Sequence, residues 1–393
     1  MICSPAQIDR YPAKMVGQLA DALVKKYAEK CDHLFDPFCG SGAILTSGKK
    51  RGLVVSGCDI NPYAVLLTEV KLNGFDPNKA QQLLTRVISS ARSSEMTLPT
   101  TWPLDYWFTR GTLDKYLRIR FSAKKHKLSE TKEGRAVLLS IASSVRRCSR
   151  ADQRSPKPFI SKEAILFRKG KHFDPYDIIS VTFSKLKELY GTIATDESEV
   201  RAIDIVKNVS SVDFQSNSYS RVITSPPYIN AQDYFRNFKL ELYLLEGLLP
   251  FAVSDVKSRF VGTEQGQLLE DVTREEEDWF RKLVPSLARI AEAGNKAEPI
   301  IYRYLHDMNA VFDRLIKIAK PGGTLVLVCG DNLISGFRIP TWQILSSILE
   351  KKGFEMFDRF HDAIERRSLA PVRSGHKGLI KEEVISAYLF PTK

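Results

Sequence analysis

Several kinds of sequence feature are scarce or missing in this chain of 393 residues. No apolar stretch approaches the roughly 18 residues that a membrane-spanning helix requires, and the amino-terminal segment lacks the apolar core of a secretory signal. From these absences we expect a cytoplasmic protein. The chain also has no internal repeat and no low-complexity tract long enough to predict disorder.

Cysteine is sparse, and acidic residues are outnumbered. The six cysteines have no paired spacing and no neighbouring histidine, so we predict reduced structural thiols and no bound metal. The 58 Lys and Arg exceed the 46 Asp and Glu, which gives a formal charge of +12. Most of this excess lies between Trp102 and Thr192, where 20 Lys and Arg stand against 9 Asp and Glu, a net charge of +11. Such a local excess favours a polyanionic partner.

A rigid polar turn follows a short apolar run at residues 221–223. Because a β-branched run that stops at two prolines is typical of a buried strand, we expect an exposed turn at the edge where open α/β sheets bind ligands. The prolines fix φ and donate no N–H, so a hydroxyl, a free carbonyl and an aromatic ring are presented together. These groups suit the exocyclic amino group of a nucleobase. The turn consists of Ser225, Pro226, Pro227 and Tyr228.

This tetrapeptide resembles the catalytic turn of the amino-methyltransferases that modify DNA. In that family a Ser at the first position is typical of cytosine-N4 enzymes, and Asp or Asn is typical of adenine-N6 enzymes. The resemblance therefore implies a catalytic role for all four residues and, through Ser225, a preference for cytosine.

A glycine-rich turn near the amino terminus also follows an expected strand, at residues 33–36. Its glycines let a ligand approach the backbone, and the helix that starts after them offers free N–H groups. The segment resembles the S-adenosylmethionine turn of Rossmann-like methyltransferases, which implies S-adenosylmethionine as the cofactor. It departs from the dinucleotide pattern, which needs a third glycine where Leu45 stands. The residues that carry the resemblance are Asp36, Pro37, Phe38, Gly40 and Gly42.

Further cofactor contacts follow from the order of the strands and from the same resemblance. A second expected strand, residues 53–58, ends in Asp59, Ile60 and Asn61, where an acidic side chain can accept hydrogen bonds from ribose hydroxyls. A helix N-cap is the alternative role of Asp59. The resemblance also implies a segment that closes over the methionine end of the cofactor and an acidic residue near its adenine amino group. The corresponding residues are Tyr11, Pro12, Lys14 and Asp213.

The basic segment between the two turns is predicted to be mainly helical, with helices near 110–128 and 135–145. Its mixture of cations and aromatic rings could supply phosphate contacts and base-edge readers. A helical lid with a solvated basic face is the alternative. Further cations follow the catalytic turn and lie between the last two expected strands. The predicted nucleic-acid-binding residues are Arg146, Arg147, Arg150, Arg154, Lys157, Arg236, Arg366, Arg367 and Arg373.

The resemblance implies an α/β, Rossmann-like class I methyltransferase fold with a seven-stranded, mostly parallel sheet and a largely helical basic insertion. Middle strands are expected at 202–206, 209–214 and 324–331, and a late antiparallel hairpin at 353–364 and 382–390. We expect a catalytic S-adenosylmethionine-binding domain at 1–75 and 200–393. The inserted region 76–199 is expected to recognise the target, and 247–300 to form a second helical insertion in the catalytic domain.

The expected reaction transfers a methyl group to N4 of cytosine in double-stranded DNA. Hydrogen bonds from the amino group to Ser225 and to the Pro226 carbonyl would direct its lone pair at the methyl group, and Tyr228 would stack on a base rotated out of the duplex. The setting implied is a restriction-modification system with a cognate endonuclease as partner. Adenine-N6 methylation of DNA, guanine-N2 methylation of RNA and a non-enzymatic DNA-binding subunit are the alternatives. Carbon-5 methylation is disfavoured because no Pro-Cys pair supplies the nucleophile.

Overall fold

The structure, a computed structural model, describes residues 15–155, 157–169, 171, 173–191, 199–202, 218–229, 234–262, 273–292, 297–334, 337–363 and 382–392. Within these ranges no helix combines the length and apolar character needed to cross a bilayer.

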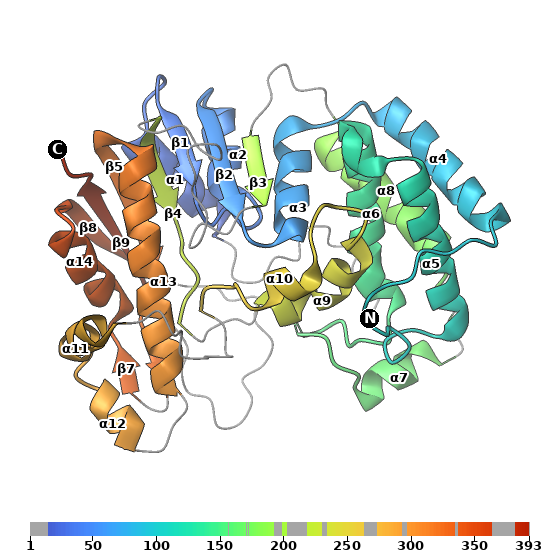
Figure 1. The fold of residues 1–393 in the computed structure, drawn as a ribbon. Coiled ribbons are helices and arrows are strands. Elements are labelled where there is room, and N and C mark those ends of the chain that lie inside the picture. Colours follow the sequence, from blue (N-terminus) through green and yellow to red (C-terminus); the bar gives the residue numbers. More distant parts are fainter. Residues whose placement is uncertain are drawn as a thin grey trace.

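A seven-stranded sheet forms one half of the molecule (Figure 1). Its strand order is β3-β2-β1-β4-β5-β9-β8. The first five strands are parallel, and β9 runs antiparallel between β5 and β8. The strands are β1 (His33–Asp36), β2 (Val54–Asp59), β3 (Glu199–Ala202), β4 (Tyr219–Thr224), β5 (Ala319–Cys329), β8 (Glu355–Ala363) and β9 (Glu382–Leu389). This arrangement confirms the predicted mostly parallel sheet of seven strands.

Helices cover both faces of the sheet, which explains why its central strands are nearly continuous apolar runs. Successive side chains of a strand point to opposite faces, and Leu34 and Phe35 of β1 accordingly belong to different hydrophobic clusters. On one face, Leu34 packs with α1 (Gly17–Tyr27) and α2 (Ala43–Lys50). On the other face, Phe35 lies in the cluster of α13 (Ala297–Ile318) and α14 (Thr341–Lys351).

A group of helices forms the other half of the molecule (Figure 1). Most of these helices begin at a side chain that accepts a hydrogen bond from a first-turn N–H, which is the preferred start of a helix. The helices are α4 (Pro77–Ser93), α5 (Arg110–Lys125), α6 (Lys132–Cys148), α7 (Lys162–Arg168) and α8 (Pro175–Tyr190), with a 3₁₀ turn at Leu128–Glu130. Their N-caps are Asp76, Thr109, Thr131, Ser161 and Asp174.

This helical group is joined to the sheet by a shared hydrophobic core. The core includes residues of α6, of α3 (Pro62–Asn73) and of α9 (Tyr234–Leu245), the helix that follows the catalytic turn. Tyr63 of α3 stacks on Phe238 of α9 with ring centroids 5.2 Å apart. The inserted helices therefore pack directly on the elements that flank both signature turns.

The remaining elements include both expected and unexpected features. The late antiparallel hairpin, β8 with β9, confirms the prediction, and so do the helices around 110–128 and 135–145. Strand β3 starts at Glu199, before the predicted strand, and the rest of 202–206 and all of 209–214 lie outside the described residues. The small antiparallel hairpin of β6 (Asn332–Ile334) and β7 (Phe337–Ile339) was not predicted. The segment 247–300 contains α10 (Val253–Lys257), α11 (Arg274–Leu283) and α12 (Leu287–Glu292).

Candidate active site

Two turns lie at one edge of the sheet. The glycine turn that follows β1 is called the cofactor turn, and the Ser225 turn that follows β4 is called the catalytic turn. Asp36, Asp59 and Thr224 are the last residues of β1, β2 and β4, which are neighbouring parallel strands. Their carboxyl ends therefore share an edge, which is where open α/β sheets bind ligands. The turns after β1 and β4 therefore lie close to each other at this edge.

The glycine turn after β1 is shaped by contacts that exclude larger residues. Gly40 and Gly42 have φ of +49° and +75°, in the region that favours glycine. A Cβ atom at Gly42 would lie 2.6 Å from Cγ2 of Thr68, and the Thr68 hydroxyl donates to the Gly40 carbonyl at 3.0 Å. Helix α3, which carries Thr68, thus packs closely against the buried turn and leaves no room for a side chain at Gly42.

Asp59, the last residue of β2, accepts one hydrogen bond from the glycine turn and one from the start of α3. Its carboxylate accepts from the backbone N–H of Gly40 at 2.9 Å and of Asn61 at 2.8 Å. Burial raises the pKa of Asp59 to about 6, and these two backbone N–H groups partly oppose the effect. The carboxylate is therefore fixed, yet each of its oxygens keeps a lone pair for a further donor.

The side chain of Asn61 also fits a bound polar group. Its Oδ1 accepts from the backbone N–H of Tyr63 at 3.1 Å and caps α3. Asn61 is fully buried, and its Nδ2 has no hydrogen-bond partner among the described residues. A buried donor of this kind usually has a partner. An orphaned donor beside an acidic acceptor and a positive-φ glycine turn fits the ribose and polar groups of S-adenosylmethionine.

A buried hydrogen bond joins the cofactor turn to the catalytic turn. The hydroxyl of Thr224 donates to Oδ1 of Asp36 at 2.6 Å, and the backbone N–H of Phe38 donates to the same oxygen at 3.1 Å. Burial raises the pKa of Asp36 to about 7, while the Thr224 and Phe38 donors lower it and the charge of Asp59 raises it further. Thr224 immediately precedes Ser225, so this bond fixes the distance between the two turns.

The catalytic turn is also held on its far side. The Tyr228 hydroxyl donates to Glu383 of β9 at 2.5 Å, and the Ile229 carbonyl accepts from Nδ2 of Asn332 at 2.8 Å. Gly262, with φ of +74°, approaches so closely that a Cβ there would lie 2.8 Å from the Tyr228 carbonyl oxygen. Ser225 is half-buried and Pro226 is buried. The turn is thus rigidly supported by segments from three distant parts of the chain.

The predicted nucleic-acid-binding residues of the insertion have different environments. Arg150 and Arg154 are exposed, Lys157 and Arg147 are half-buried, and Arg146 is 7% exposed. Arg146 donates to the backbone carbonyls of Asp152 and Ser155. Its guanidinium is therefore used inside the protein, which argues against the predicted phosphate contact.

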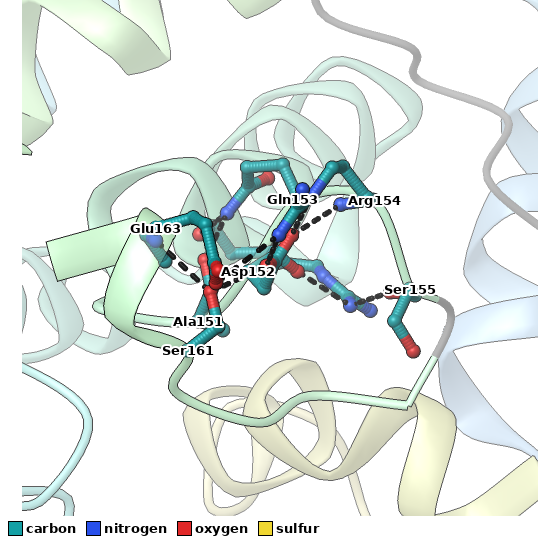
Figure 2. A network of polar contacts seen from close by, with 9 residues as sticks. Ala151, Asp152, Gln153, Arg154, Ser155, Ser161 and Glu163 are labelled. Atoms are coloured by element: carbon teal, nitrogen blue, oxygen red, sulfur yellow. Dashed lines mark hydrogen bonds and ion pairs between the residues drawn. The ribbon is translucent and has the colours of Figure 1, made fainter. Parts of the chain in front are cut away.

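Figure 2 shows the polar network that organises the loop between α6 and α7. Asp152 accepts from the guanidinium of Arg154 at 3.0 and 2.6 Å and from the Ser161 hydroxyl at 2.6 Å. The Arg154 hydrogen bonds are the main reason why the pKa of Asp152 is well below its usual range. Arg154 also pairs with Glu163 at 3.7 Å. This loop is therefore a defined structure that carries exposed cations.

Several predicted site residues lie outside the described part of the chain. Arg236, in contrast, lies within the described ranges, on α9, and its side chain is exposed. The residues outside the described ranges are Tyr11, Pro12, Lys14, Asp213, Arg366, Arg367 and Arg373.

Four residues around the catalytic turn were not identified from the sequence. The Thr224 hydroxyl donates to a carboxylate of the cofactor turn, and the Glu383 carboxylate accepts from the hydroxyl of the catalytic turn. Gly262 and Asn332 contact backbone carbonyls of the catalytic turn. Glu383 had an indirect signal. An antiparallel last strand begins at the edge where parallel strands end, so the first residues of β9 had to lie near the site.

Comparisons with known proteins bear on the amino-terminal part of the chain, which contains the glycine turn, and on the chain as a whole. Residues 14–135 match the family model described as D12 class N6 adenine-specific DNA methyltransferase. This match contains the cofactor turn and ends before Ser225. The type II methyltransferase M.AvaI of Nostoc sp. strain PCC 7120 is 22% identical, over 88% of this chain and 78% of its own length. M.MvaI of Kocuria varians is 22% identical over 91% of this chain and 84% of its own.

Other similarities are shorter or weaker. The type II methyltransferase M.MjaII of Methanocaldococcus jannaschii is 31% identical over 91 residues, which are 23% of this chain and 17% of that protein. A solved SAM-dependent methyltransferase from Methanosarcina mazei aligns over 94% of this chain and 98% of its own, with 11% identity and a TM-score of 0.35. Residues 14–135 are thus similar to a family of DNA methyltransferases, and over most of its length the chain is a distant relative of type II methyltransferases.

Proposed function

We propose that this site transfers a methyl group to an exocyclic amino group of a base in double-stranded DNA. The observation that carries the proposal is the buried hydrogen bond between Thr224 and Asp36, because it sets the Ser225 turn beside the cofactor turn. Two reactants held in a fixed geometry react far faster than free ones. A subunit that only bound DNA would have no need for this arrangement.

The residues of the catalytic turn would act on the amino group by hydrogen bonding. An amino nitrogen attached to a base is a weak nucleophile because its lone pair is delocalised into the ring. Acceptance of its hydrogens by the Ser225 hydroxyl oxygen and the Pro226 carbonyl would localise that lone pair and orient it. S-adenosylmethionine supplies the electrophilic methyl group when it is bound. No covalent enzyme intermediate is required, so alignment and electrostatics provide the catalysis.

The target base must leave the duplex to reach this turn, because its amino group is otherwise paired and stacked. Tyr228 offers a ring on which the base could stack. We expect the exposed Arg150 and Arg236, with the half-buried Lys157, to contact phosphates, whereas Arg154 would first have to leave its ion pair with Asp152. The similarity to type II methyltransferases supports a role in a restriction-modification system.

Adenine N6 is the base position that the family model favours, and it was the alternative in the sequence analysis. The expected cytosine-N4 specificity has no support from the family match. One observation still favours cytosine as a second candidate: the matched segment stops at residue 135, and Ser225, the residue typical of cytosine-N4 enzymes, lies beyond it.

The test is to incubate the purified chain with methyl-labelled S-adenosylmethionine and mixed-sequence duplex DNA, then digest the DNA and identify the labelled nucleoside by mass. N6-methyladenine would support the first candidate, and N4-methylcytosine would support the second. RNA of mixed sequence serves as the parallel substrate. Label in RNA alone, or in neither nucleic acid, would refute the proposal.

A further inference from the structure

The ring of Tyr228 is tied to a carboxylate that no part of the proposed reaction uses. Its hydroxyl donates to Glu383 Oε1 at 2.5 Å, within the range of charge-assisted O–H···O⁻ hydrogen bonds. Desolvation, with the charge and hydrogen bond of Glu383, holds the pKa of Tyr228 well above its usual value, and the nearby Ser225 hydroxyl partly opposes the shift. The phenol is therefore the donor and the carboxylate the acceptor.

The position of Glu383 follows from the topology of the sheet. Strand β9 is antiparallel to β5, and Val384 pairs with Cys329, the last residue of β5. The start of β9 consequently lies at the edge where β1, β2 and β4 end. Glu383 reaches the catalytic turn from this position although 155 residues separate it from Tyr228.

The backbone that carries the ring is fixed independently of Glu383. Asn332 donates to the Ile229 carbonyl at 2.8 Å, and Gly262 packs against the Tyr228 carbonyl. With the backbone held, the side-chain torsions of Tyr228 are the remaining freedom of the ring. A hydrogen bond at the far end of the ring removes that freedom, because the hydroxyl must stay within reach of Glu383.

We propose that Glu383 is a positioning residue for the methyl transfer: it holds the Tyr228 ring in the orientation in which an extruded base stacks on it. The inference rests on the proposed function and deepens it. A ring already fixed before the base arrives loses less conformational entropy when the base binds, and small misplacements of a reacting group are costly. Glu383 need not touch the base itself.

The test measures methyl transfer to mixed-sequence duplex DNA by the full-length chain and its variants. Glu383→Ala should lower the rate at saturating DNA about tenfold and leave the affinity for S-adenosylmethionine unchanged. Glu383→Gln keeps an amide oxygen that can accept from Tyr228, so it should retain most of the activity. The matched control is Glu382→Ala, which removes the neighbouring exposed glutamate, 3.5 Å from His361 on β8, and should behave as the wild type.

A double-mutant cycle separates positioning from an independent role. Tyr228→Phe keeps the ring and removes the donor, so it should lose activity to a similar extent as Glu383→Ala. The rate of methyl transfer by the double variant should then equal that of the less active single variant. Full activity of Glu383→Ala would overturn the proposal, and so would a double variant whose loss is the product of the two single losses.

An activity-independent readout shows whether the contact exists in solution. In protein labelled with ¹³C at tyrosine Cζ, Tyr228→Phe identifies the Tyr228 resonance by its absence. Glu383→Gln should shift that resonance and Glu382→Ala should not; an unmoved resonance would refute the contact. If wild-type protein transferred no methyl group to DNA, the proposed function would fail and the role of Glu383 with it, even with the contact present.

Discussion

At the residue scale, one buried hydrogen bond joins Thr224 to Asp36 and so links the two turns. Thr224 is 1% exposed and Asp36 is 3% exposed, and the hydroxyl of the first donates to the carboxyl of the second. The raised pKa of Asp36, about 7, means that the folded protein binds a proton more tightly than the unfolded chain. The stability that this group contributes is therefore fully present near pH 4 and is lost as the pH rises through about 7.

This linkage gives a prediction for Thr224→Val. At pH 8 the ionised Asp36 would lose its hydroxyl donor inside the protein, so the free energy of unfolding should fall by about 2 kcal/mol. At pH 5 Asp36 is mostly protonated and the loss should be smaller. Urea unfolding at the two pH values measures the difference, and Thr224→Ser, which keeps the hydroxyl, is the control. An equal loss at both pH values would contradict the assigned partnership.

Residue-scale patterns also mark the limit of sequence-based prediction. The positions of the turns after β1 and β4 could be predicted because their glycines and prolines impose their own backbone geometry. Arg146 was predicted to contact nucleic acid because its sequence neighbours are cations, whereas its partners in the structure are the carbonyls of a loop that forms only in the folded chain. Glu383 has no local pattern at all, since its role depends on a contact across 155 positions.

At the element scale, residues 260–262, which lie between α10 and α11, contact the catalytic turn and α9. Gly262 has φ of +74° and packs against the Tyr228 carbonyl oxygen, while Phe260 lies near Phe235 of α9 with ring centroids 6.4 Å apart. The segment 247–300 was expected to be an insertion within the catalytic domain. Its contact with the turn gives it a direct part in the geometry of the site.

We expect Gly262→Ala to displace the catalytic turn, because the new Cβ would lie 2.8 Å from the Tyr228 oxygen. The rate of methyl transfer should fall about tenfold, and the affinity for S-adenosylmethionine should not change. Gly52→Ala is a matched control, since Gly52 has φ of +75° and no atom within 4 Å of the added Cβ. That control should lose about 1 kcal/mol of stability from backbone strain and keep full activity. Equal activity of the two variants would show that the contact is unimportant.

Element boundaries were predicted unevenly for a physical reason. Strands β1, β2, β4 and β5 are apolar runs that end at a turn signal, so they could be found from the sequence. Strand β3 lies at one edge of the sheet and, within the described ranges, is paired with β2 alone; its short sequence, Glu-Val-Arg-Ala, shows little apolar pattern. The β6–β7 hairpin is held by contacts such as that of Asn332 with Thr341, which have no local signal.

At the scale of the whole molecule, a buried cation joins the helical group to the end of α9, the helix that follows the Ser225 turn. Arg120 of α5 is 2% exposed and donates to the carbonyls of Leu98 and Pro99 and, across the junction, to those of Leu244 and Glu246 at the end of α9. Burial lowers the pKa of Arg120 to about 10, and the charge of Glu246 partly opposes the shift. Arg120 thus stabilises the packing of the basic region from inside, whereas other arginines of this region lie on its surface.

Arg120→Met should therefore destabilise the whole protein. Loss of the guanidinium leaves several buried carbonyls without a donor, which we expect to cost about 3 kcal/mol of the free energy of unfolding. Arg118→Met is the control: Arg118 lies on the same helix, its side chain is 30% exposed, and it pairs with Asp114 and donates to the Ser94 carbonyl at 2.6 Å, so about 1 kcal/mol should be lost. Urea unfolding midpoints measure both variants. Similar losses would contradict the role of Arg120 as the junction.

The measurement that tests the central claim most directly compares wild-type protein with Ser225→Ala in the labelled methyl-transfer assay on mixed-sequence duplex DNA. Both proteins should bind S-adenosylmethionine. The wild type should place its label on an exocyclic amino group of a DNA base, and Ser225→Ala should transfer little or none. Equal transfer by both proteins, or label on carbon 5 of cytosine, would contradict the assignment of the Ser225 turn as the site of amino methylation.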